Sequence, residues 1–228
     1  MIKLTEDKFV TNLIGFKSYI TNKKILSQKL SNIKKPFFLS IKSKKKLSFK
    51  KKTKNIKISL ISKLIYFERD FKKNLFINIT CRKAKKTDIK KIINLAKENN
   101  LNSRFIKDKF ISKSFKVKYR SEWVRNFFRK KRGDYLLVAE KKKKILGFIL
   151  ILKKKNIFTI DLVASGKKHR KKKVASSLIN FVNNKIMKNK DKIVAGTQID
   201  NLIAIKMYKK LGFVRKKNKT FCYHIHGA

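Results

Sequence analysis

The stretch that decides the fold runs from residue 161 to 179 and reads DLVASGKKHRKKKVASSLI. It opens with an apolar strand-like segment, continues with consecutive basic residues at 167–173, and ends in a helical pattern. Val174, Leu178, Val182 and Ile186 recur at intervals of four residues, so one face of this helix is buried. The segment therefore predicts strand, loop and helix. Its basic loop is interpretable as a nucleic-acid patch, a solvated charge run or a phosphate-binding loop.

The basic residues of the whole chain do not by themselves indicate a nucleic-acid partner. The formal net charge is +51, but nine of the 64 basic residues are arginine, so lysine outnumbers arginine about six to one. Arginine is the residue that binds guanine edges and phosphates with two parallel hydrogen bonds. A/T-rich codons encode Lys, Ile, Asn and Phe. A nucleotide bias of the genome therefore explains the many lysines more simply than selection for binding nucleic acid does. We expect no specific nucleic-acid partner.

Targeting, disulfide and metal signals are absent from the sequence. Cys81 and Cys222 lie far apart, without the spacing of a zinc site or a disulfide framework. The first ten residues lack an apolar signal core, and the longest apolar run, ILGFILIL at 145–152, is far shorter than a membrane-spanning helix. We expect a cytoplasmic protein with no membrane span and no bound metal.

The element order predicts an α+β (mixed α/β) fold with two parts. Residues 1–76 alternate lysine clusters with short apolar stretches, which indicate short strands and one helix, and we place a boundary between this smaller N-terminal subdomain and residues 77–228. In the second part, strands are expected at 77–83, 134–140, 144–152, 157–164, 192–198 and within 213–226, and helices at 87–99, within 115–131, at 173–188 and at 201–211.

Two motifs in this second part resemble those of the GNAT acyl-CoA N-acyltransferases. In that family a central strand leads to an Arg/Gln-x-x-Gly-x-Gly/Ala loop, and a later helix carries Asn, Ala and Tyr ahead of Gly-Phe. The corresponding residues here are Arg170, Lys173, Ala175, Asn201, Ala204, Tyr208, Gly212 and Phe213. The resemblance covers about 78–226, and Lys173 stands where the family has its first loop glycine. It implies a twisted mixed sheet flanked by helices and acetyl-CoA as co-substrate.

A finer likeness concerns the acceptor. NSRFIKD at 102–108, SEWVRN at 121–126 and TFCYHIH at 220–226 are similar to segments of the dTDP-fucosamine acetyltransferases. Those enzymes acetylate the amine of a nucleotide-linked 4-amino-4,6-dideoxy sugar. The resemblance implies a small amine acceptor of this kind, with Arg104 pairing with its phosphate and Asp161 lining its site. Trp123 is interpreted as a core residue.

The resemblance also assigns the cofactor site. A helix start binds pyrophosphate through its free N–H groups and dipole, and the loop at 170–175 lies where that is needed. The strand edge at 163–165 would contact pantetheine and the thioester carbonyl. The expected cofactor-binding residues are Val163, Ser165, Arg170, Lys171, Lys172, Lys173, Val174, Ala175 and Asn201.

Acetyl transfer needs a proton donor for the leaving thiolate and a route for the proton of the amine. Tyr208 shares a helical face with Asn201 and Ala204, and the resemblance implies that it is the donor. For the base, Asp161, Glu122 and a chain of water molecules stay open. His224 and His226 share one face of a strand, where a structural or substrate-edge role is favoured over metal ligation.

Two other functions stay open. The chain is also interpretable as a GNAT fold that no longer catalyses and binds polyanions, since Lys173 and the charge of +51 both favour that reading. An acetyltransferase that acts on protein amines is the other. The sequence leaves open whether the chain works as a monomer or as a homodimer.

Overall fold

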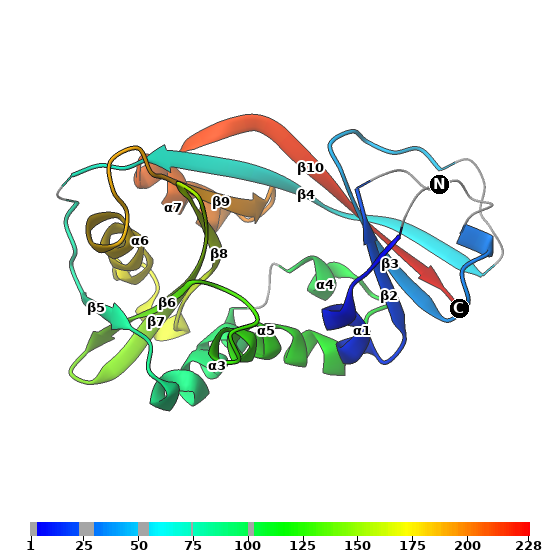
Figure 1. Ribbon diagram of the computed structural model, residues 1–228, viewed down its shortest axis with the longest axis horizontal. Coiled ribbons are helices and arrows are strands. Elements are labelled where there is room, and N and C mark those ends of the chain that lie inside the picture. Colours follow the sequence, from blue (N-terminus) through cyan, green and yellow to red (C-terminus); the bar gives the residue numbers. More distant parts are fainter. Residues whose placement is uncertain (1–3, 23–29, 50–54, 74, 100–102) are drawn as a thin grey trace.

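The computed structural model describes residues 4–22, 30–49, 55–73, 75–99 and 103–228. Within them, ten strands form a single sheet in the order β1-β2-β3-β10-β4-β9-β8-β7-β6-β5 (Figure 1). The strands are β1 (Thr5–Glu6), β2 (Lys17–Thr21), β3 (Phe37–Ser43), β4 (Ile56–Asp70), β5 (Thr80–Lys83), β6 (Tyr135–Lys141), β7 (Lys144–Lys154), β8 (Ile157–Ser165), β9 (Lys192–Gln198) and β10 (Val214–Gly227). The helices are α1 (Lys8–Ile14), α3 (Ile89–Glu98), α4 (Arg104–Lys107), α5 (Lys113–Phe128), α6 (Val174–Lys185) and α7 (Leu202–Lys210), with short 3-10 turns at Lys86–Asp88 and Lys167–His169.

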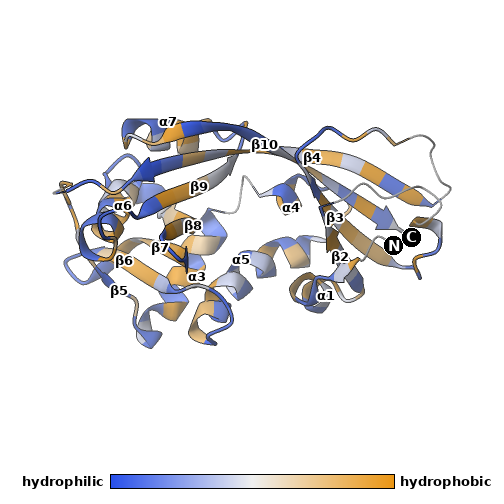
Figure 2. Cartoon of the chain, turned by 45° about the horizontal axis from the view of Figure 1, so that its top comes forward, coloured by the Kyte–Doolittle hydropathy of each residue, from blue (hydrophilic) through white to orange (hydrophobic). Residues whose placement is uncertain are grey.

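The predicted mixed α/β fold with a sheet flanked by helices is confirmed. The expected strand at 192–198 matches β9, and the helix expected at 201–211 matches α7 within one residue at each end. Central strand β7 is buried from Ile145 to Ile151, because helices cover both of its faces (Figure 2). A continuous apolar run such as ILGFILIL is the pattern that a strand buried on both faces requires.

Helices pack on both faces of the β5–β9 part of the sheet. On one face α6 and Tyr208 of α7 pack against a core that includes Phe67 and Phe158. On the other, α3 and α5 pack against Phe148 and Leu162. Gly147 of β7 lets α6 approach closely, because a Cβ atom there would lie 2.6 Å from a methyl group of Val174.

Strand β4 connects the N-terminal residues to the rest of the chain. It is fifteen residues long, and its second half pairs with β9 and with the first part of β10, while its first half pairs with the end of β10. β4 and β10 therefore run side by side from one half of the molecule to the other (Figure 1). The expectation of only short strands before residue 76 is wrong for this element, whose pairing partners lie far along the sequence. The division at residue 76 stays a prediction.

The segment between β4 and β5 is held against α6 by asparagine side chains. Asn180 Nδ2 donates to the carbonyl of Phe76 at 2.9 Å, and Asn184 Nδ2 donates to the carbonyl of Leu75 at 2.6 Å. The backbone N–H of Lys72 donates to Asn183 Oδ1 at 3.3 Å. These bonds satisfy backbone groups that belong to no strand, so the described residues that take part in them are held against α6.

Strands β8 and β9 are parallel neighbours that pair only at their first residues. Their register runs from Ile157–Lys192 to Ile160–Ala195 and then stops, so the two strands separate beyond Ile160. At the same point β8 carries a β-bulge against β7, since Ile160 pairs with Ile151 and Leu162 with Leu150. Asp161 is the extra residue of this bulge. The end of β8 is thus freed from its neighbour on one side.

Candidate functional site

The loop before α6 has the backbone conformation of a glycine-containing turn although it is made of lysines. Lys171 has a φ of 60° and Lys173 a φ of 58°, both in the left-handed region. That conformation costs a non-glycine residue roughly 1–2 kcal/mol, so the surrounding fold imposes it. The first turn of α6 also has backbone N–H groups without an acceptor inside the helix. The loop therefore keeps the shape of an anion-binding helix start.

Residues of other elements hold this loop in place. Asn99, which follows α3, donates to the Ser165 carbonyl at 2.9 Å and accepts from Arg170 at 3.4 Å. The ammonium of Lys173 contacts Asn78 Oδ1 at 3.4 Å. Lys171 and Lys172 are exposed, and Val174 is buried. Of the expected cofactor residues, those of the loop lie next to one another at the end of β8.

Other expected cofactor residues lie at the ends of the two strands that separate, β8 and β9. Val163 and Ser165 belong to the free end of β8, while Asn201 follows the end of β9. Asn201 caps α7, because its Oδ1 accepts from the N–H of Ala204 at 3.3 Å, and its Nδ2 donates to Thr197 Oγ1 at 3.0 Å. Ala175 lies in the first turn of α6.

Tyr208 is buried in the core between two aromatic rings. Its ring centroid lies 5.5 Å from that of Phe67 and 5.3 Å from that of Phe213. Burial raises the pKa of the phenol above its usual value. The hydroxyl therefore stays protonated at neutral pH, which a proton donor requires.

Both carboxylates considered as bases are engaged by arginines. Asp161 accepts two hydrogen bonds of 2.6 Å from Arg132. Burial raises the pKa of Asp161, and the positive charge of Arg132 opposes that rise. Glu122 contacts Arg125 at 2.6 Å and Arg129 at 3.0 Å. Neither carboxylate has an oxygen without an arginine partner.

The chain matches known proteins in the region that contains these features. Residues 101–213 match the Acetyltransferase (GNAT) family. The chain contains a GNAT acetyltransferase domain.

Individual relatives are more distant. The chain is 27% identical over 139 residues to the Spore coat polysaccharide biosynthesis protein SpsD of Bacillus subtilis (strain 168), a match that covers 60% of this chain and 47% of that protein. The chain thus spans about half the length of this curated relative.

Two solved structures share the fold. A functionally unknown conserved protein from Staphylococcus epidermidis has a TM-score of 0.63 at 13% identity, covering 100% of this chain and 95% of its own. A GNAT-family acetyltransferase from Novosphingobium aromaticivorans has a TM-score of 0.53 at 11% identity, covering 85% and 75%.

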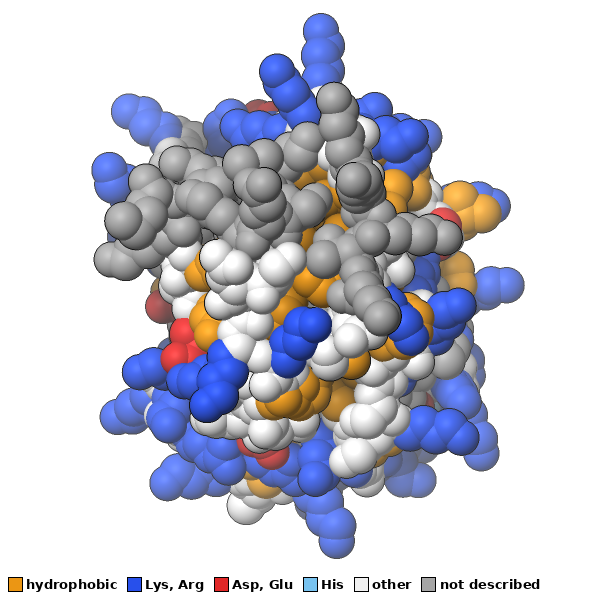
Figure 3. Space-filling model, turned by 90° about the vertical axis from the view of Figure 1, so that its right-hand side faces the viewer, with side chains coloured by type: hydrophobic (Ala, Val, Ile, Leu, Met, Phe, Trp, Pro, Cys, Tyr) orange, Lys and Arg blue, Asp and Glu red, His pale blue; other side chains and the backbone are white. Residues whose placement is uncertain are grey.

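The lysines and arginines on one face of the molecule are dispersed. Figure 3 shows Lys and Arg side chains projecting around the whole margin of one face, with apolar and polar side chains between them. Of the lysine runs at 141–144 and 153–155, the residues at 142–143 and 155 occupy turns between strands, and the others belong to the ends of the strands. No helix within the described residues is long and apolar enough to cross a membrane.

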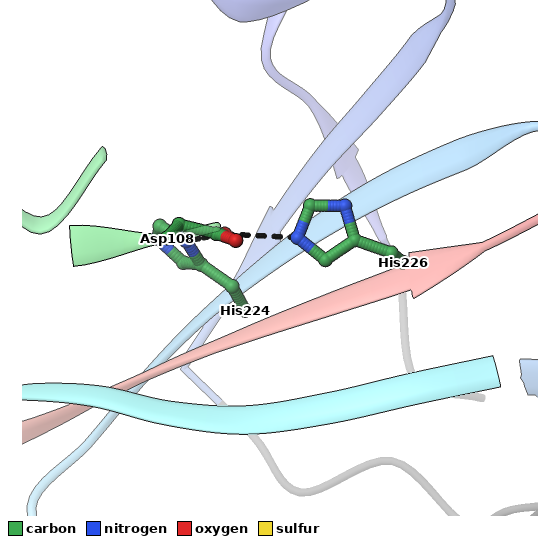
Figure 4. A group of neighbouring side chains, drawn as sticks. All are labelled: Asp108, His224 and His226. Carbon is green, nitrogen blue, oxygen red and sulfur yellow. Dashed lines mark hydrogen bonds and ion pairs between the residues drawn. The ribbon is translucent and has the colours of Figure 1, made fainter. Parts of the chain in front are cut away.

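A triad of buried Asp108, buried His224 and partly buried His226 lies where α4 meets the sheet (Figure 4). Asp108 Oδ2 lies 2.6 Å from His224 Nδ1 and 2.8 Å from His226 Nε2. Ligand atoms around a zinc ion stand roughly 3.3 Å apart, given bonds of about 2.0 Å, so these separations are those of hydrogen bonds. Burial favours the neutral form of Asp108, but the two histidines outweigh it and lower its pKa below the usual value.

Sequence reasoning paired the two histidines but missed Asp108. The spacing of His224 and His226 indicates one face of a strand, whereas Asp108 comes from a segment that precedes them by 116 residues. No local pattern links these positions. The expectation of no metal stays a prediction.

The triad predicts a pH dependence of stability. Burial lowers the pKa of His224 to about 4, although its hydrogen bond to Asp108 opposes this shift. Since the unfolded state takes up a proton near pH 6.5, stability should fall by up to about 1.4 kcal/mol per pH unit as the pH drops from 6.5 to 4. Urea unfolding at a series of pH values measures this slope. The variant His224→Gln should flatten it; an unchanged slope in that variant contradicts the assignment.

Proposed function

We propose that the protein transfers an acetyl group from acetyl-CoA to the primary amine of a small acceptor, a nucleotide-linked amino sugar. The observation that carries the proposal is the pair of separating parallel strands β8 and β9, with an anion-binding helix start directly after β8. The pyrophosphate of acetyl-CoA binds at the loop of Arg170, Lys171, Lys172 and Lys173 and the first turn of α6. Pantetheine then lies along the end of β8, on the side where its backbone groups no longer pair with β9.

The reaction is direct attack. The nitrogen of the neutral amine forms a bond to the thioester carbonyl carbon, and the bond from that carbon to sulfur breaks. Tyr208 gives its proton to the leaving thiolate. Because the oxygens of Asp161 and Glu122 all contact arginines, we assign the proton of the amine to a chain of water molecules leading to solvent.

The choice of acceptor rests on likeness. A protein whose name refers to spore coat polysaccharide biosynthesis shares 27% identity with this chain, and Arg104 stands in a segment similar to that of sugar-nucleotide acetyltransferases. A protein amine as acceptor stays the alternative within the same chemistry.

Calorimetry with acetyl-CoA tests the first step, followed by an assay of thiol release with a panel of amines. We expect saturable one-to-one binding of acetyl-CoA, and thiol release that depends on an amino-sugar nucleotide. Absence of acetyl-CoA binding would contradict the proposal that the protein is an acetyltransferase. Salt-sensitive binding of nucleic acid in its place would support the polyanion-binding alternative.

The loop makes a separate prediction for Lys173→Gly. Glycine adopts a φ of 58° without steric cost, so the substitution should keep the Kd of acetyl-CoA within about threefold or improve it. Lys190→Gly is the matched control, because Lys190 has a φ of 73° in the turn before β9. A loss of affinity of tenfold or more in Lys173→Gly alone would mean that the lysine ammonium itself binds the cofactor.

A further inference from the structure

Four cationic side chains from four different segments gather beside the bulge of β8. We call Lys42, Arg104, Arg120 and Arg132 the basic cluster. Aromatic rings connect its members: the guanidinium carbons of Arg120 and Arg132 lie 4.9 Å and 4.4 Å from the ring centroid of Trp123.

The aromatic contacts continue to Arg104. The Trp123 ring centroid lies 5.1 Å from that of Tyr119, and the Tyr119 centroid lies 4.5 Å from that of Phe105. The guanidinium carbon of Arg104 lies 4.7 Å from the centroid of Phe105. Trp123, which the sequence suggested as a core residue, packs partly buried against the core cluster of Phe105 and Tyr119, and its ring also lies near two guanidinium groups.

The positive charges of this cluster lie close enough to act on one another. Asp161 bonds to Arg132 through both of its oxygens. Glu122 belongs to α5, the helix that carries Arg120, and it contacts Arg125 and Arg129. Burial lowers the pKa of Lys42, and the charges of Arg104 and Arg132 lower it further. Burial likewise lowers the pKa of Arg120. Holding like charges together in partly buried positions is costly unless an anion joins them.

The nucleotide bias that favours lysine codons does not explain the cluster. An A/T-rich codon bias places lysine at exposed positions, whereas arginine is scarce, with nine in the chain. Three of those nine arginines belong to this one cluster. The Nε atom of Arg104 is moreover buried and has no hydrogen-bond partner among the described residues. A planar guanidinium suits phosphate oxygens, which accept two parallel hydrogen bonds from it.

We propose that the basic cluster binds the diphosphate of the acceptor substrate. This inference rests on the proposed function and narrows its acceptor to an amine that carries a diphosphate ester. Arg132 is bonded to Asp161, which lies two residues before Val163 on the strand assigned to the thioester. An acceptor held by its diphosphate therefore presents its amine next to the transfer point, which is the positioning that a bimolecular transfer needs.

Calorimetry with inorganic pyrophosphate and with dTDP tests the site. Both titrations are made at physiological ionic strength on protein saturated with acetyl-CoA, so that the α6 loop is occupied. Arg120→Gln should weaken binding of both probes at least tenfold. Arg129→Gln removes the same charge from the residue that follows the same helix, outside the cluster, and should change Kd less than twofold.

A second cluster variant and two contradicting outcomes keep the test decisive. Lys42→Gln should also weaken binding at least tenfold, and it carries the test if Arg120→Gln fails to fold. Equal Kd values in wild type, Arg120→Gln and Lys42→Gln, or an equal loss in Arg129→Gln, would overturn the site in favour of diffuse attraction to a basic surface. Failure of acetyl-CoA to bind would instead overturn the proposed function, while the comparison of cluster and control variants with pyrophosphate stays readable.

Discussion

Replacing Tyr208 with phenylalanine should lower the turnover number about a hundredfold or more and change the Kd of acetyl-CoA less than about threefold. The substitution removes one hydroxyl and keeps the ring that packs between Phe67 and Phe213, so folding is preserved. Without the phenol, the thiolate must leave unprotonated or take its proton from water. Steady-state kinetics and calorimetry on the same preparation separate the two effects.

Tyr135→Phe is the matched control for this experiment. Tyr135 of β6 stacks on Phe158 of β8, with ring centroids 6.2 Å apart, and packs against the same core. It has no role in the proposed transfer, so its variant should keep wild-type turnover. Wild-type turnover in Tyr208→Phe would remove Tyr208 as the acid and leave water as the donor.

Asp108→Ala should destabilise the protein by about 1–3 kcal/mol for each buried group that it leaves unsatisfied, because it removes the hydrogen-bond partner of two histidines. His224 is fully buried and already has an unpartnered Nε2 atom, so losing Asp108 leaves both of its nitrogens unsatisfied within the described structure. Urea unfolding near pH 7 measures the loss.

Asp70→Ala provides the comparison for an exposed carboxylate. Asp70 contacts Lys192 at 3.3 Å while its side chain is 76% exposed, so its removal should cost less than about 1 kcal/mol. Similar losses in the two variants would contradict a structural role for the triad. Asp108→Asn should fall between them, since an amide oxygen accepts from one histidine but carries no charge.

The elements of the second half could be predicted from the sequence because their signals are local. The spacing of apolar residues at 174–186 and the run at 145–152 predict a helix with one buried face and a buried strand, and α6 and β7 occupy those positions. The cap at Asn201 is equally local, as its acceptor atom reaches an N–H three residues on.

Features that join distant segments could not be predicted in this way. The register that makes Asp161 a bulge residue depends on how β8 pairs with β7, although an acidic residue in an apolar strand drew attention to the position. The basic cluster combines side chains from β3, α4, α5 and the residues after α5. The fifteen-residue length of β4 depends on two partner strands far along the chain, which no window of sequence reveals.

The place of β4 in the sheet also bears on how the protein is made. Both neighbours of β4 follow it by more than 120 residues, and β3 likewise pairs with β10 across about 180 residues. A ribosome therefore releases residues 37–70 long before the strands that satisfy them exist. Pairings of such separation form slowly, and the waiting edges invite association with other chains. Nascent chains that carry many dispersed lysines repel one another. This repulsion opposes aggregation during the interval in which the strand edges are still unpaired.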